Sequence, residues 1–223
     1  MTRQYQCVIF DWDGTLMNSE ARIVSSIQTA AERVGFPVLP YDVSKQIIGL
    51  SLEKAILTLY PDADESGIEA MAKGYTDCFL DESCVPMLPF EGAEALLQFL
   101  HGEGVKVAIA TGKSRKGLDQ VLDEVGFEPY FHFTRTPVES ESKPSPLMLQ
   151  QILDEFDLAP EQAVMVGDTE FDMQMAQTID MDRIALSHGV HELERLQGFD
   201  PVASFDDLMS MQAWLKDRLL PHA

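Results

Sequence analysis

Short apolar runs that end in polar turns alternate with helical patterns along most of the chain. Runs that are apolar at every position are typical of strands buried on both faces of a sheet. They cover residues 7–10, 105–110 and 163–166 and, less clearly, 130–133 and 183–186. Apolar residues spaced three and four positions apart predict helices over 93–100, 116–125, 147–156, 171–177 and 205–219. This alternation predicts an α/β fold with a parallel sheet covered by helices.

One long stretch breaks the alternation. Between residues 17 and 87 the chain carries helical stripes and no convincing strand. A connection of this length inside a compact protein is expected to have a fold of its own. We therefore predict two domains, which are a core of residues 1–16 and 88–223 and a helical domain of residues 17–87 inserted after the first strand.

The charge of the chain disfavours two classes of partner. The 223 residues include 16 Lys and Arg against 37 Asp and Glu, which gives a net charge of −21. Such a chain repels phosphate backbones and anionic lipid surfaces, so we expect no nucleic acid and no membrane as partner. The 3 cysteines do not form a disulfide framework, and we expect neither a signal peptide nor a membrane span. A reducing, cytoplasmic location is therefore expected.

Polar side chains follow the predicted strands, at the edge where ligands bind in parallel α/β sheets. They are Asp11 and Asp13, Thr111, Lys143, and Asp168 with Asp172. The carboxylates would repel one another unless a cation joined them, and their hard oxygens suit Mg²⁺. The lysine, the hydroxyl and the backbone N–H groups of the turn at Gly14 would add donors around a phosphoryl group. A free carboxylate in such a site can attack phosphorus and form an aspartyl-phosphate.

Four segments of the chain resemble the motifs of the haloacid dehalogenase superfamily of phosphotransferases. They are FDWDGTL at 10–16, Thr111 after an apolar strand, KPSP at 143–146 and VGDTEFDM at 166–173, in the order of the family. The helical insertion directly after the first motif resembles the branch with a small α-helical cap, to which phosphoglycolate phosphatases and β-phosphoglucomutases belong. The resemblance implies a Rossmann-like parallel sheet core flanked by helices, with the cap domain inserted after the first strand.

The resemblance also implies a role for each motif residue. Asp11 would be the nucleophile and Asp13 the general acid and base, with Thr111 and Lys143 completing the catalytic set. Mg²⁺ would be bound by Asp11, by Asp13 through its carbonyl, and by Asp168, and Asp172 would support the metal through water or Lys143. The phosphate-binding residues would be Gly14, Thr111, Gly112 and Lys143.

Two further groups of residues lie near these motifs. In the cap, the segment that selects substrates in similar enzymes corresponds to Gly49, Ser51 and Lys54. After the second motif comes the basic cluster Lys113, Arg115 and Lys116. We expect this cluster to be a solvated first helical turn.

The sequence as a whole indicates a Mg²⁺-dependent phosphatase that acts on a small phosphorylated metabolite, such as phosphoglycolate or a sugar phosphate. The acid at Asp13 disfavours a dehalogenase, because the dehalogenases of this superfamily lack an acid at that position. A phosphomutase of the β-phosphoglucomutase type is the nearest alternative. An alternative of another class is a receiver-like or non-catalytic phosphate-binding protein. The oligomeric state stays open.

Overall fold

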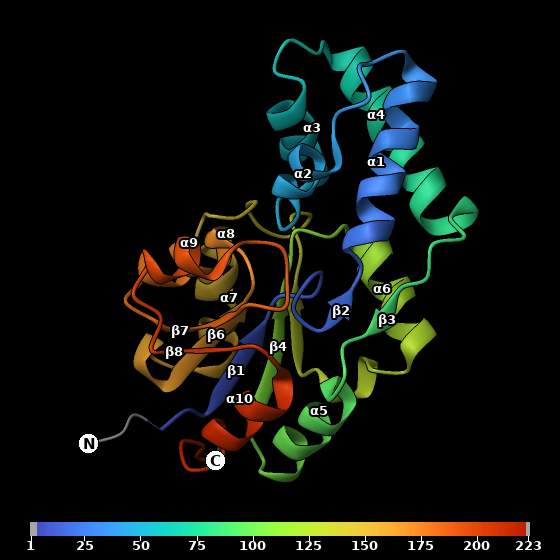
Figure 1. Cartoon of the computed structure of the whole chain (residues 1–223). Helices are drawn as coiled ribbons and strands as arrows, with labels where there is room; N and C mark the ends of the chain where they lie inside the picture. Colours follow the sequence, from blue (N-terminus) through green and yellow to red (C-terminus); the bar gives the residue numbers. More distant parts are fainter. Residues whose placement is uncertain (1–3, 222–223) are drawn as a thin grey trace.

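Six parallel strands form the central sheet of the computed structural model, which describes residues 4–221 (Figure 1). The strand order is β5–β4–β1–β6–β7–β8. The strands are β1 (Cys7–Phe10), β4 (Lys106–Ala110), β5 (Phe133–Arg135), β6 (Ala163–Gly167), β7 (Asp182–Leu186) and β8 (Ala203–Phe205). The predicted domain ranges extend to residues 1–3 and 222–223, which lie outside the described residues. The predicted α/β fold with a parallel sheet is confirmed.

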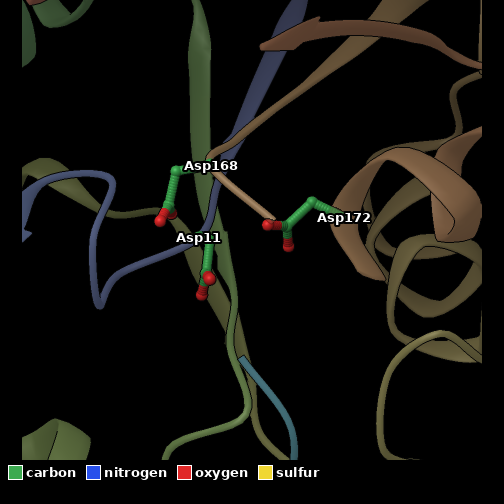
Figure 2. Close-up of side chains that lie close together, drawn as sticks. All are labelled: Asp11, Asp168 and Asp172. Atoms are coloured by element: carbon green, nitrogen blue, oxygen red, sulfur yellow. The ribbon is translucent and has the colours of Figure 1, made fainter. Parts of the chain in front are cut away.

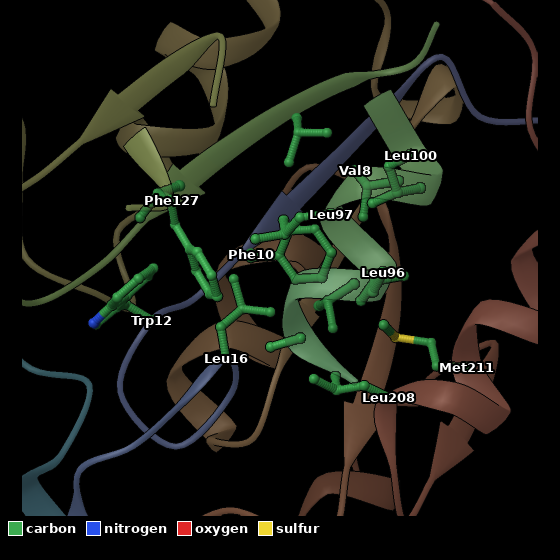
Figure 3. Packing of buried hydrophobic residues seen from close by; sticks show 14 of the residues in the cluster. Val8, Phe10, Trp12, Leu16, Leu96, Leu97, Leu100, Phe127, Leu208 and Met211 are labelled. Carbon is green, nitrogen blue, oxygen red and sulfur yellow. The ribbon is translucent and has the colours of Figure 1, made fainter. Parts of the chain in front are cut away.

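The sheet is buried on both faces because alternate side chains of each strand point to opposite sides. Val8 and Phe10 of β1 face a core built with helices α5 (Ala93–Gly102), α6 (Arg115–Val125) and α10 (Leu208–Leu215). Figure 3 shows this packing around Phe10. Cys7 and Ile9 face a second core, built with helices α7 (Leu147–Phe156) and α8 (Glu170–Gln177). The apolar strands thus lie between two layers of helices. Both faces of β1 are therefore buried up to the point where the strand reaches the polar site.

The helical insertion lies beyond the carboxyl end of the sheet (Figure 1). It contains α1 (Glu20–Val34), α2 (Tyr41–Ser44), the 3₁₀-helix η1 (Lys45–Ile47), α3 (Leu52–Leu59), α4 (Glu65–Asp77) and the π-helix η2 (Cys78–Glu82). A buried cluster that includes Ile27, Ile56 and Met71 joins α1, α3 and α4. The insertion therefore has an apolar core of its own. No helix between residues 4 and 221 has the length and apolar character needed to cross a membrane.

Two predicted features of the insertion and its neighbours are corrected. The strands β2 (Met17–Asn18) and β3 (Leu88–Pro89) pair antiparallel where the chain enters and leaves the insertion, although no strand was predicted over 17–87. Two residues are too short to show a strand periodicity. The predicted strand 130–133 begins at Phe133 instead, because Glu128–Tyr130 forms the 3₁₀-helix η3 with a proline in its first turn.

The end of the chain is corrected as well. A helix was predicted from Phe205, but Ala203–Phe205 is the strand β8, paired with β7. The carboxylate of Asp207 accepts a hydrogen bond from the Ser210 N–H at 2.7 Å and so begins α10 at Leu208. Helix α9 (Leu193–Gln197) lies between β7 and β8 and was also not predicted.

The core assignment predicts unequal effects of two leucine truncations. Leu97 is fully buried against the sheet, whereas Leu57 of the insertion is 39% exposed. Leu97→Ala is expected to lower the free energy of unfolding by about 2–5 kcal/mol, because it leaves a cavity. The control Leu57→Ala is expected to change it by less than about 0.5 kcal/mol. Urea unfolding of both variants measures the difference, and equal losses would contradict the assignment.

Candidate active site

The site begins where β1 ends, at Asp11. The Asp11 N–H donates to the Val166 carbonyl at 3.0 Å, so this residue continues the pairing of β1 with β6. Its side chain is fully buried. Oδ1 accepts from the Trp12 N–H at 2.7 Å and lies 2.9 Å from Nζ of Lys143. Oδ2 is buried and has no hydrogen-bond partner, which leaves one oxygen of Asp11 free to act.

Lys143 lies between two carboxylates and is itself completely buried. Its Nζ is 2.9 Å from Asp11 Oδ1 and 2.6 Å from Asp172 Oδ1. The other oxygen of Asp172 accepts from the Thr169 N–H at 3.1 Å and from the Thr169 hydroxyl at 2.7 Å. Both oxygens of Asp172 are therefore occupied, one by the lysine and one by the first turn of α8.

Asp168 completes a group of three buried carboxylates. Its Oδ1 accepts from the Thr15 hydroxyl at 2.6 Å, and its Oδ2 accepts from the Val190 N–H at 2.8 Å. One carboxylate oxygen each of Asp11, Asp168 and Asp172 lies within 4.8 Å of the others. Figure 2 shows these side chains gathered at the ends of β1 and β6 and at the start of α8.

Burial and mutual repulsion raise the pKa values of Asp11 and Asp168. Burial raises the pKa of Asp11 to about 7, although Lys143 beside it acts to lower that pKa. Burial also raises the pKa of Asp168 well above its ordinary value, and the charge of Asp11 adds to this rise. Burial alone would lower the pKa of Lys143, but the charges of Asp11 and Asp172 raise it above its ordinary value.

The donor set fits a hard divalent cation. The cluster contains three carboxylates and one ammonium group, which contacts two of them. When all are ionised, the cluster therefore carries an excess of negative charge. The unused lone pairs of the Asp11 and Asp168 carboxylates are hard oxygen donors, which Mg²⁺ prefers. A cation there would relieve the repulsion that raises both carboxyl pKa values.

The Asp13 carboxylate lies outside the group of three buried carboxylates. Its two oxygens lie 3.1 and 3.0 Å from Nζ of Lys113, and both side chains are less than 10% exposed. The ammonium of Lys113 also lies 4.3 Å from the ring centre of Phe79, in the insertion. The prediction of a solvated turn is therefore wrong for Lys113. Lys113 precedes the Ser114 cap of α6, and its side chain extends between Asp13 and the insertion instead of into solvent.

The other two residues of the basic cluster, Arg115 and Lys116, differ in their contacts. Arg115 binds Glu139 at 2.9 Å and Asp119 at 3.1 Å, so it also has fixed partners, whereas Lys116 is exposed as expected.

The turn within the first motif is held by a glycine and by backbone hydrogen bonds. Gly14 has φ +84°, and a Cβ there would lie 2.2 Å from Asp168 Oδ2, so the position requires glycine. The Gly14 N–H donates to the Met17 carbonyl at 2.9 Å, and the Thr15 N–H donates to the Trp12 carbonyl. The Gly14 and Thr15 amides are therefore engaged within the turn.

The second motif lies at the end of β4, against the insertion. Thr111 is 1% exposed, and its hydroxyl oxygen accepts from the Lys113 N–H at 3.2 Å, which leaves the hydroxyl proton available. A Cβ on Gly112 would lie 2.3 Å from the carbonyl oxygen of Gly49. Glycine at 112 thus permits the backbone of the insertion to touch the motif.

The predicted cap residues do contact the core. The Ser51 N–H donates to the Ser142 hydroxyl at 2.9 Å, and the Lys54 ammonium donates to the Lys143 carbonyl at 3.0 Å. Gly49 has φ +98° and lies against Thr169 of the fourth motif. The segment from Gly49 to Lys54 therefore packs on the loops that carry Lys143 and Asp168.

Several groups that contact the site residues were given no role in the chemistry from the sequence. They are Thr15, Lys113, Ser142 and the Val190 N–H. Thr15 lies inside the first motif and Lys113 two residues after Thr111, so their positions were a usable signal. Ser142 and Val190 act through a loop hydroxyl and a backbone amide, which no residue pattern distinguishes.

Known proteins resemble the chain in sequence and in fold. A family model described as haloacid dehalogenase-like hydrolase matches residues 8–186. The chain is 32% identical over 205 residues to a probable phosphatase, IndB, of Dickeya dadantii, which covers 89% of this chain and 88% of that protein. It is 24% identical over 218 residues to a phosphoglycolate phosphatase of Nitrosococcus oceani, which covers 95% and 97% of the two chains. A hydrolase of Pseudomonas syringae has the same fold, with TM-score 0.85 and 20% identity over 95% of this chain and 98% of that one.

Metal binding at the carboxylate group is expected to stabilise the protein. Millimolar Mg²⁺ should raise Tm relative to EDTA, because a ligand that binds only the folded state adds to its stability. Asp168→Asn should remove most of this increment, since it replaces a charged donor. The control is Asp154→Asn on an exposed position of α7, which should keep the full increment. An equal Mg²⁺ increment in both variants would place the cation elsewhere.

The buried Lys143 is expected to stabilise the fold as well as the site. Lys143→Met leaves Asp11 and Asp172 without their shared partner and should cost about 3–5 kcal/mol of unfolding free energy. Lys73 forms a comparable pair with Asp77, but its side chain is 77% exposed. Lys73→Met should therefore change stability little. Chemical unfolding of the two variants without metal compares them, and a mild effect of Lys143→Met would show that the carboxylates are neutral in the absence of the lysine.

Proposed function

Because the chain belongs to the haloacid dehalogenase-like hydrolases, we propose that it is a Mg²⁺-dependent phosphatase of small phosphate monoesters. The observation that carries this proposal is the buried Asp11, whose Oδ2 is free while Lys143 holds its Oδ1. A carboxylate fixed at one oxygen and open at the other is suited to attack phosphorus. In this proposal residues 1–16 and 88–223 form the catalytic core, and the insertion of residues 17–87 is the cap.

The first step transfers the phosphoryl group to Asp11. Its Oδ2 forms a bond to phosphorus while the bond from phosphorus to the ester oxygen breaks. Asp13 gives a proton to the departing oxygen, which leaves as an alcohol. Asp13 is paired with Lys113 in the structure, and this contact holds its carboxyl group beside the site.

The second step returns Asp11 to its starting state. A water molecule attacks phosphorus, Asp13 accepts its proton, and the bond between Asp11 and phosphorus breaks to release inorganic phosphate. In this proposal the ammonium of Lys143, beside Asp11, and the hydroxyl of Thr111 stabilise the phosphoryl oxygens as they gain charge. Contact of the insertion with the core keeps bulk water from the intermediate.

The proposed ligands of Mg²⁺ are Asp11, Asp168 and the Asp13 carbonyl. When bound, the cation supplies positive charge that neutralises the phosphoryl oxygens. Asp172 is proposed to act on this centre through Lys143, because both of its oxygens are already hydrogen-bonded. The relatives that are named phosphatases support a small phosphorylated substrate. The family also disfavours a receiver module, since Asp11 follows the first strand and a helical insertion comes next.

Phosphate release tests the proposed function. Purified protein with Mg²⁺ should release inorganic phosphate from at least one small ester, and EDTA should abolish release. Asp11→Asn should lower kcat by about 10³-fold or more, because an amide cannot replace the carboxylate as nucleophile. Asp154→Asn serves as the matched control and should keep full activity.

Two results would contradict the proposal. Normal turnover by Asp11→Asn, with deamidation excluded by mass spectrometry, would overturn the aspartyl-phosphate. Isomerisation of a sugar phosphate without release of inorganic phosphate would identify the mutase alternative.

A further inference from the structure

A small cavity lies between the insertion and the core, on the side of the site where Asp13 is. Its volume is about 70 Å³. The core contributes Asp13, Gly112 and Lys113 to its lining. The insertion contributes mainly apolar side chains, among them Ile23, Ile48, Leu50, Leu52 and Phe79. This cavity is therefore a hydrophobic compartment that opens on one catalytic carboxylate.

The position of the cavity relates it to the leaving group. In the proposed reaction, Asp11 attacks phosphorus from one side and Asp13 protonates the oxygen that leaves. Asp13 borders the cavity, whereas Asp11 does not line it. The alcohol portion of the ester, attached to the oxygen that Asp13 protonates, is thus directed into this compartment.

Two of the polar side chains of the lining, Thr76 and Ser114, are hydrogen-bonded within the protein. The Thr76 hydroxyl donates to the Ala72 carbonyl at 2.8 Å, within α4. The Ser114 hydroxyl accepts from the Gly117 N–H at 3.2 Å, as the cap of α6. Tyr75 stacks on Phe79 with ring centres 5.6 Å apart. A polyhydroxylated alcohol would lose its hydrogen bonds to water and find few replacements here.

The ion pair that lines the cavity also disfavours an alcohol that carries a carboxylate. Asp13 and Lys113 face the cavity as a nearly buried ion pair, and they neutralise each other. A carboxylate placed beside them would either stay unpaired at low dielectric or take Lys113 away from Asp13. Both outcomes are unfavourable, because an unpaired buried charge is strongly destabilising. An apolar group meets neither penalty and gains from leaving water.

We infer that this cavity binds the alcohol portion of the substrate and that the preferred substrates are phosphate monoesters of compact, apolar alcohols. The inference rests on the proposed phosphatase function and specifies its substrate class. It disfavours phosphoglycolate and sugar phosphates.

A set of three esters of similar size tests the inference. They are n-propyl phosphate, glycerol 3-phosphate and phosphoglycolate, all of which release an alkyl oxygen. We expect kcat/KM for n-propyl phosphate to exceed both others by about tenfold or more, the range in which a hydrophobic pocket discriminates. Equal or higher values for either polar ester would overturn the inference and leave the phosphatase function intact. Absence of phosphate release from every ester, with Asp11→Asn indistinguishable from wild type, would overturn the proposed function and this inference with it.

A variant of the cavity wall tests the location. Thr76→Lys places a second ammonium in the lining, and it should raise the ratio of kcat/KM for phosphoglycolate over n-propyl phosphate by about tenfold. The matched control is Thr58→Lys, on an exposed turn of α3, where the threonine makes the same hydrogen bond to the fourth preceding carbonyl at 2.7 Å. This control should leave the ratio unchanged. An unchanged ratio in a folded Thr76→Lys protein, checked by its thermal melt, would place the alcohol elsewhere.

A second variant, Leu80→Ala, tests the same cavity without adding the charge that Thr76→Lys introduces. Leu80 lines the cavity and is only partly buried, so its truncation is a mild change to the fold. Leu80→Ala should enlarge the compartment and shift the preference from n-propyl toward n-pentyl phosphate. Loss of both activities in equal proportion would contradict the assignment of the cavity to the alcohol.

Discussion

The buried ammonium of Lys143 is the constraint on which the rest of the site depends. It has no access to water, so its charge is tolerable only while Asp11 and Asp172 both remain within hydrogen-bond distance. Asp11 is fixed by the pairing of β1 with β6, and Asp172 is fixed by the first turn of α8. The lysine therefore couples the centre of the sheet, one loop and one helix into a single unit. The same arrangement leaves one oxygen of Asp11 without a hydrogen-bond partner, and that oxygen is the one proposed to attack phosphorus.

The core and the insertion contribute different kinds of surface to the site. The core supplies the charges, which lie in the segments that follow β1, β4, β5 and β6 and in the first turn of α8. The insertion supplies apolar walls and reaches the core through Gly49, Ser51 and Lys54. Lys113 belongs to both, since it is paired with Asp13 and lies over the ring of Phe79. The ion pair of Asp13 and Lys113 is thus a point where the charged core meets the apolar insertion.

Much of this architecture could be predicted from the sequence, for a definite physical reason. β1, β4 and β6 are buried on both faces, so they are continuously apolar and the polar residues after them are conspicuous. Asp11, Lys143, Asp168 and Asp172 do meet at one edge of the sheet as the motifs predict.

The features that escaped prediction depend on contacts rather than on periodicity. The buried position of Lys113 depends on Phe79 in the insertion, and the commitment of the Gly14 N–H depends on the return of the chain at Met17. The strands β2 and β3 are too short to leave a pattern. Their pairing has a further consequence for the history of such chains. Because Met17 lies opposite Pro89 and Asn18 opposite Leu88, the chain enters and leaves the insertion at neighbouring points. Evolution can therefore lengthen, shorten or exchange the whole insertion as a module without disturbing the register of the main sheet.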